Sequence, residues 1–195
     1  MSGTGGIATG GQSGGGSGFF DSATGLITAG PWVGNAYTVA GAGSTVSPAC
    51  TTTGCSPPWG AQPCASGNVA AGNTETFGML GFSTTSSGTG WPVSGTGVYV
   101  NITATPPAQL TELRIQLVAV NCAQNGSGDD CRYCSALPAG GVGLIPFSSF
   151  KTKCWSPGGN SVPNGTKIDQ VQIQMPSSGS QAMPFNFCIA DIKPQ

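Results

Sequence analysis

The chain has 195 residues, with six basic and seven acidic side chains and a formal net charge of −1. So few cations cannot build the basic surface that holds nucleic-acid phosphates, which excludes nucleic acid as an expected partner. The 33 glycines and 15 prolines disfavour long helices and favour short strands joined by tight turns, and the length suits one sizeable core.

The first 18 residues form a glycine-rich segment, MSGTGGIATGGQSGGGSG, with almost no side chain that a core would bury. This composition is typical of a flexible linker. A stalk that holds a domain away from an anchor or a neighbouring module has the same composition and is an alternative. We therefore expect an arm over residues 1–18 and one folded domain over residues 19–195.

Order is expected to begin in FFDSATGLITAGPWVGNAYTVAG, where aromatic and β-branched residues are separated by turn residues. Two short strands are predicted here, with Trp32 in the core. The next stretch, ACTTTGCSPPWGAQPC, is a loop rich in proline and cysteine. Cys50 and Cys55 are close enough to bridge locally, and the small loop that they close would present Trp59 as an exposed ring for stacking.

The longest regular alternation runs from Val98 to Val120, VYVNITATPPAQLTELRIQLVAV. Every second residue along each half is apolar, as a half-buried strand requires. Pro106 and Pro107 cannot donate to a strand ladder, so TPPAQ is predicted to turn the chain into the second strand of a hairpin.

Further strands are predicted on both sides of this hairpin, in CASGNVAA, TFGMLGFST, TKIDQVQIQM and MPFNFCIADI. Between them, GGVGLIPFSSFKTKCW should form a short strand, one turn of helix from Phe147 to Lys151 and a Cys-Trp pair. The regular spacing of strands and turns predicts an all-β fold, a two-sheet antiparallel β-sandwich.

If the hairpin and TKIDQVQIQM share a sheet, the polar face of that sheet is a platform of amides with one guanidinium and one phenol ring. Such groups bind the hydroxyls of sugars, while exposed rings stack on their C–H faces. A solvated outer face without a ligand is the alternative. The candidate carbohydrate-binding residues are Tyr99, Asn101, Arg114, Gln116, Gln172 and Gln174 for hydrogen bonds, and Trp59, Trp91 and Tyr133 for stacking.

A polar loop, NCAQNGSGDDC, lies between Cys122 and Cys131. Its oxygen ligands, Asn125, Asp129 and Asp130, are spaced too irregularly for a dedicated calcium loop. We expect a solvated turn and no metal site or cofactor here, with a structural calcium ion as the weaker alternative.

The chain has no histidine, so the common serine and cysteine hydrolases lack their base and imidazole-bound zinc or copper is excluded. Glycoside hydrolysis needs two carboxylates on either side of the bond. Asp129 and Asp130 are adjacent on one loop, and nothing in the sequence requires Glu112 and Asp169 to approach each other. We therefore expect no enzymatic activity.

Eight cysteines in a chain without histidine indicate disulfides rather than zinc. The spacing alone does not choose among the many pairings open to eight cysteines. Disulfides imply an oxidising compartment, so the protein is expected to be secreted, extracellular or at a cell surface. No apolar run of about 20 residues is present, and we expect no membrane insertion.

The segments CASGNV, GMLGF, RYCSAL, IPFSSFKTKCW and PFNFCIADI resemble secreted bacterial β-jelly-roll domains of the galactose-binding-like, carbohydrate-binding-module type. In that group an IPWSxFxTxCW-like stretch precedes a closing PFxFC strand, and Phe147 stands here in place of the usual Trp. The resemblance implies a jelly roll and non-catalytic carbohydrate binding. It also implies the disulfides Cys134–Cys154 and Cys64–Cys188, which leaves Cys50–Cys55 and Cys122–Cys131 as local bridges.

Together these observations predict a disulfide-stapled β-sandwich that binds a neutral polysaccharide without cleaving it. The alternative is a structural or assembly protein of a cell surface or extracellular fibre, since low charge, glycine richness and disulfides suit lateral packing as well. In that case the glycine-rich arm would mediate self-assembly through contacts between subunits.

Overall fold

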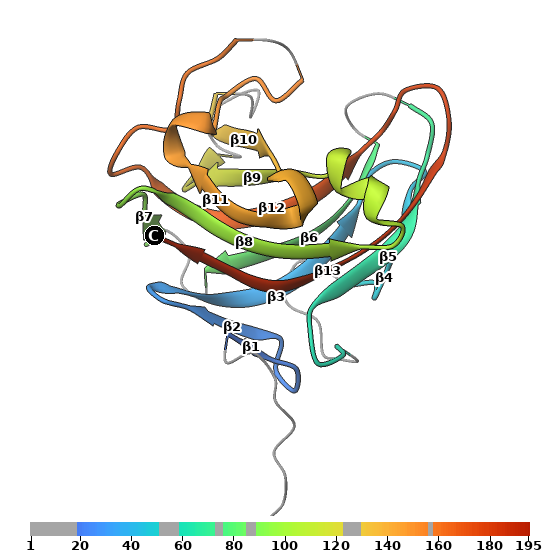
Figure 1. Ribbon diagram of the computed structural model, residues 1–195, viewed down its shortest axis with the longest axis horizontal. Coiled ribbons are helices and arrows are strands. Elements are labelled where there is room, and N and C mark those ends of the chain that lie inside the picture. Colours follow the sequence, from blue (N-terminus) through green and yellow to red (C-terminus); the bar gives the residue numbers. More distant parts are fainter. Residues whose placement is uncertain (1–18, 51–58, 73–75, 85–88, 123–129, 156–157) are drawn as a thin grey trace, which may run out of the picture.

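A computed structural model of the chain describes residues 19–50, 59–72, 76–84, 89–122, 130–155 and 158–195. Two antiparallel sheets lie face to face with the core between them (Figure 1). The predicted two-sheet antiparallel sandwich is therefore confirmed. The predicted arm, and with it the alternative of self-assembly through that arm, lies outside the described residues.

The larger sheet, sheet A, has eight strands, and the smaller, sheet B, has five. In the described part of the chain, three short 3-10 helices connect strands: η1 (Pro107–Thr111), η3 (Ala139–Gly141) and η4 (Phe147–Ser149). In sheet A the order is β1 (Phe20–Asp21), β2 (Leu26–Ala29), β3 (Trp32–Ala40), β6 (Phe77–Thr84), β12 (Lys167–Pro176), β9 (Arg114–Ala119) and β10 (Arg132–Ala136), with β7 (Trp91–Pro92) paired to β12. In sheet B it is β11 (Val142–Pro146), β8 (Gly97–Ala104), β13 (Met183–Pro194), β5 (Cys64–Val69) and β4 (Thr45–Ser47).

The predicted alternation places the apolar side chains in the core. Val98, Val100 and Ile102 of β8 are fully buried, and so are Ile115 and Leu117 of β9. Burying an aliphatic side chain of this size contributes about 1.5–3 kcal/mol relative to exposing it. Since successive side chains of a strand point to opposite faces, the residues between them lie on the outer faces of the two sheets.

The predicted hairpin between β8 and β9 is wrong. β8 pairs with β11 and β13 in sheet B, whereas β9 pairs with β12 and β10 in sheet A. The segment between them forms η1, with Leu110 buried, and carries the chain from one sheet to the other. Alternation fixes which side chains face the core, but two strands that face one core from opposite sheets have the same pattern as two neighbours in one sheet.

Three disulfides join described residues: Cys64–Cys188, Cys122–Cys131 and Cys134–Cys154. They are the pairs that the resemblance implied, and they fit an oxidising, extracellular environment. The remaining predicted pair, Cys50–Cys55, includes a cysteine outside the described residues. Among the described residues, no helix is long and apolar enough to cross a membrane.

Candidate functional site

Four of the predicted site residues come together on the outer face of sheet A. β9 and β12 are antiparallel neighbours, and their register places Gln116 opposite Gln172 and Arg114 opposite Gln174. The residues between them, such as Ile115 and Ile173, face the core, so the polar four all face outward. These four residues therefore share one face, and their predicted role in binding stays a prediction.

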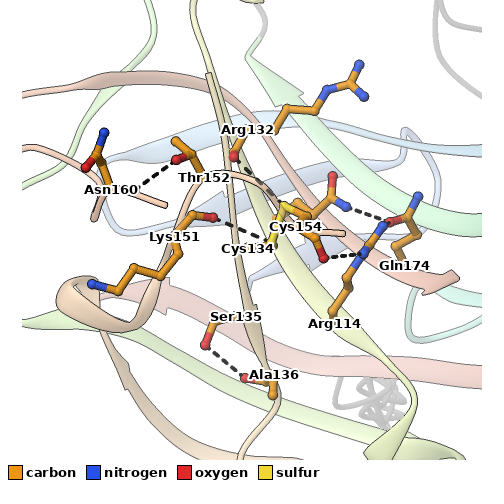
Figure 2. Close-up of a disulfide and its surroundings, with 11 residues drawn as sticks. Arg114, Arg132, Cys134, Ser135, Ala136, Lys151, Thr152, Cys154, Asn160 and Gln174 are labelled. Atoms are coloured by element: carbon orange, nitrogen blue, oxygen red, sulfur yellow. Dashed lines mark hydrogen bonds between the residues drawn. A yellow bond between two sulfur atoms is a disulfide. The ribbon is translucent and has the colours of Figure 1, made fainter. Parts of the chain in front are cut away.

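The Arg114 guanidinium is held by the amides of β9 and β12 (Figure 2). Its Nε atom donates to Gln174 Oε1 at 2.7 Å, its Nη2 atom donates to the same oxygen, and its Nη1 atom donates to the Cys154 carbonyl oxygen at 3.3 Å. Gln116 Nε2 also donates to Gln174 Oε1, at 2.6 Å. A rotated Gln116 amide would instead accept from Arg114 Nε at 3.0 Å and from Nη2 at 3.1 Å. In both orientations amide oxygens fix the guanidinium.

Trp155 covers this guanidinium from outside the sheet. The Arg114 Cζ atom lies 3.5 Å from the centroid of a Trp155 ring, a cation–π contact. Trp155 follows Cys154, whose disulfide to Cys134 of β10 ties this segment to the sheet. The Trp155 side chain is nevertheless 39% exposed. Trp155 is therefore both in contact with Arg114 and accessible to a ligand.

Burial gives Arg114 an unusual electrostatic setting. Desolvation, with the nearby charge of Arg132, lowers the pKa of Arg114 to about 10. The group is still a cation at neutral pH, because that pKa remains well above 7. The amide and carbonyl oxygens that hold it are neutral, so they satisfy its hydrogen bonds without cancelling its charge.

A second hydrogen-bond network lies beside the first, around Tyr37 of β3. The Tyr37 hydroxyl donates to Gln170 Oε1 at 2.9 Å and accepts from Gln172 Nε2 at 2.9 Å. The ring lies over Gly81 of β6, where a Cβ atom would stand 2.7 Å from Tyr37 Cζ. Burial raises the pKa of the Tyr37 phenol, which keeps it a neutral hydrogen-bonding group. Sequence analysis missed Tyr37; the glycine opposite it in FGMLGF was its only signal.

A pocket of about 70 Å³ opens between the two networks. Its volume is room for a few water molecules, or for one substituent of a larger ligand. Apolar side chains line one part of it, and amides with one guanidinium line the other. The lining residues are Phe77, Met79, Gln116, Arg132, Cys154, Trp155, Gln172 and Gln174.

Tyr99 and Asn101 do not belong to this face. They lie on β8, in sheet B, and face outward on the opposite side of the sandwich. Lys193 Nζ lies 5.2 Å from the Tyr99 ring centroid. The prediction that these two residues share one platform with Arg114 is wrong, because it depended on the hairpin that does not form.

The three aromatic residues predicted as exposed stacking partners are all in the core. Trp59 is 7% exposed and meets Phe20 edge to face, with ring centroids 5.9 Å apart. Trp91 is 5% exposed and stacks on Trp32 at 5.4 Å, and Tyr133 is 8% exposed. The predicted exposure of these rings is therefore wrong. Among the described residues, the exposed aromatic side chain beside sheet A is Trp155, which follows Cys154 in the polar, glycine-rich sequence CWSPGGNS.

The weak calcium candidates, Asn125 and Asp129, lie outside the described residues, and Asp130 is exposed. In the described part of the chain, no cluster of acidic or cysteine side chains could hold a metal ion. Glu112 and Asp169 lie near opposite ends of the β9–β12 pair, about seven residues or roughly 23 Å of strand apart.

Comparison of the chain with models of known protein families finds no match, and neither does comparison with curated proteins.

Proposed function

We propose that the protein binds polysaccharide without cleaving it, through the outer face of sheet A. The observation that carries the proposal is the partly exposed Trp155, whose ring contacts Arg114 beside the amides of β9 and β12. An exposed indole supplies the apolar surface on which the C–H face of a sugar ring stacks, and the amides supply donors and acceptors for its hydroxyls.

Polar atoms around the pocket remain available to a ligand. Gln172 Oε1 and Gln174 Nε2 make no hydrogen bond within the described residues, yet neither is sealed from solvent. The other atoms of these amides are held by the two networks, so their orientation is fixed before a ligand arrives. Preorganised groups bind more tightly because less side-chain entropy is lost on binding.

The pocket and Trp155 would hold different parts of one sugar unit. The pocket is too small for a pyranose ring but large enough for one ring substituent. Trp155, at its rim, would carry the ring itself. The ligand would therefore lie along the surface of the sheet, as an internal unit of a long chain can.

The test is retention of the protein on a panel of immobilised polysaccharides. Trp155→Ala should weaken binding roughly tenfold, because it removes the stacking surface. Tyr99→Ala is the matched control, since it removes an aromatic ring from the opposite outer face and should leave retention unchanged. Equal retention of the Trp155→Ala variant and the unmodified protein would reject the site.

A further inference from the structure

Two arginines adjoin the pocket, and neither has an acidic partner in the described part of the chain. No carboxylate oxygen of the described residues lies within 4.0 Å of a nitrogen of either Arg114 or Arg132. The ion pair that those residues do form, between Lys193 and Asp191, belongs to β13 in sheet B. One of these uncompensated cations, Arg132, lines the pocket, and the other, Arg114, lies behind the lining residue Gln174, to which it is hydrogen-bonded.

Arg132 differs from Arg114 in being exposed and unbound. It starts on β10, and its side chain extends away from the Cys134–Cys154 disulfide (Figure 2). Within the described residues its guanidinium makes no hydrogen bond, whereas that of Arg114 makes three, to two acceptor oxygens. Arg132 lines the pocket, and its charge acts on both Arg114 and Tyr37. The Arg132 guanidinium is thus exposed beside the pocket, and its N–H donors are available to a ligand.

The acidic residues near this face do not neutralise the arginines. Asp169 of β12 acts on Tyr37, and Asp130 acts on Tyr133. Asp169 Oδ1 is buried and has no hydrogen-bond partner among the described residues, so this oxygen does not reach the pocket. Repulsion between two like charges in a partly buried setting is relieved when an anion binds between them.

We propose that the pocket binds the carboxylate of an acidic sugar unit, with the Arg132 guanidinium as its direct partner and Arg114 adding the second positive charge. This inference rests on the proposed function and replaces the neutral polysaccharide expected from sequence with one that carries carboxylates. A guanidinium matches a carboxylate with two parallel N–H donors. The free Gln174 Nε2 adds a further donor, and the uronate ring would stack on Trp155.

The experiment compares polygalacturonate with the same polymer after full methyl esterification. Esterification removes the charge and keeps the sugar ring, its linkages and its hydroxyls. The unmodified protein is expected to bind the acid form about tenfold more tightly, as a charge-assisted hydrogen bond implies. Added salt should weaken binding of the acid form and leave the ester form unaffected.

Arg132→Gln should abolish the preference for the acid form and leave binding of the ester form unchanged. Lys193→Gln is the control, because it removes the same charge from the opposite sheet and should preserve the preference. Equal binding of acid and ester forms by the unmodified protein, with Trp155→Ala still weakening both, would overturn the carboxylate assignment and leave the proposed function standing. If neither these polymers nor any in the panel is retained, both proposals fail.

Discussion

Gln172 belongs to the Tyr37 network and lies opposite Gln116 of the Arg114 network, and it is a polar side chain that the sandwich buries. It is 7% exposed, while Gln116 and Gln174 are 3% and 4% exposed. Alternation alone predicts that these residues face outward. It does not predict that this part of the outer face is itself shielded from solvent, as the burial of the three glutamines shows.

Replacing Gln172 by Ala should therefore destabilise the protein as well as weaken binding. The Gln172 Nε2 atom donates to the Tyr37 hydroxyl and to Gln170 Oε1, at 2.9 and 2.7 Å. Loss of such a buried donor costs about 1–3 kcal/mol, so the melting temperature should fall by a few degrees. Thr103→Ala, at an exposed position of β8, is the control in the same thermal unfolding measurement. An unchanged melting temperature for Gln172→Ala would show that the network contributes nothing to stability.

Asp169 is a residue whose charge the fold disfavours. Desolvation raises its pKa above the ordinary value of 3.8, and its buried Oδ1 has no hydrogen-bond partner among the described residues. A raised pKa in the folded state means that the native protein holds this proton more tightly than the unfolded chain. The contribution of Asp169 to stability is then fully present below pH 3.8 and is lost as the pH rises through the folded-state pKa.

Asp169→Asn should accordingly stabilise the protein more at pH 7 than at pH 3, because the amide cannot ionise. Urea denaturation at both pH values measures the difference in unfolding free energy between variant and unmodified protein. A difference that is equal at the two pH values, or larger at pH 3, would contradict the raised pKa.

At the scale of elements, the sequence pattern predicts which side chains each strand buries. It predicts less well which strands pair with each other. The inward residues of β8 and β9 are as expected, and η4 lies within the predicted turn of helix at Phe147–Lys151. The hairpin was wrong because Pro106 and Pro107 end a strand whether the chain returns to the same sheet or crosses to the other one. That one choice of sheet removed Tyr99 and Asn101 from the site.

The residues that complete the site come from segments without strand periodicity. Trp155 lies after η4, and its position depends on the Cys134–Cys154 disulfide, which is a contact between distant parts of the chain. Arg132 was missed because the short sequence RYCSA gave no strand prediction, whereas β10 lies there. Arg114 and the three glutamines could be predicted because they stand at alternate positions of β9 and β12, which are neighbours in sheet A.

The Cys134–Cys154 disulfide should matter for binding more than its effect on stability suggests. With a separation of 20 residues, chain entropy assigns it about 3.3 kcal/mol, against about 2.6 kcal/mol for Cys122–Cys131 with a separation of nine. The two double alanine variants should therefore have similar unfolding free energies. Cys134→Ala/Cys154→Ala should also lose retention on polysaccharide, because Trp155 is no longer anchored, whereas Cys122→Ala/Cys131→Ala should keep it. Equal retention by both variants would show that other contacts position Trp155.

At the scale of the whole molecule, one covalent link closes most of the chain into a loop. Cys64 of β5 and Cys188 of β13 are directly opposite on neighbouring strands of sheet B, yet they are 124 residues apart in sequence. The loop between them contains β6 to β12, and so the strands of sheet A that carry the candidate site.

Cys64→Ala/Cys188→Ala should consequently be the most destabilising of the three disulfide removals. The chain-entropy relation assigns a closed loop of 124 residues about 4.9 kcal/mol, more than either shorter loop, because the unfolded chain regains the most freedom when the longest loop opens. Urea titration of the three double variants at one pH measures the order directly, and polysaccharide retention below the unfolding transition should be preserved in this variant, since the bond lies in sheet B. A smaller loss of stability than for Cys122→Ala/Cys131→Ala would mean that structure retained in the unfolded chain, rather than loop length, determines what each disulfide contributes.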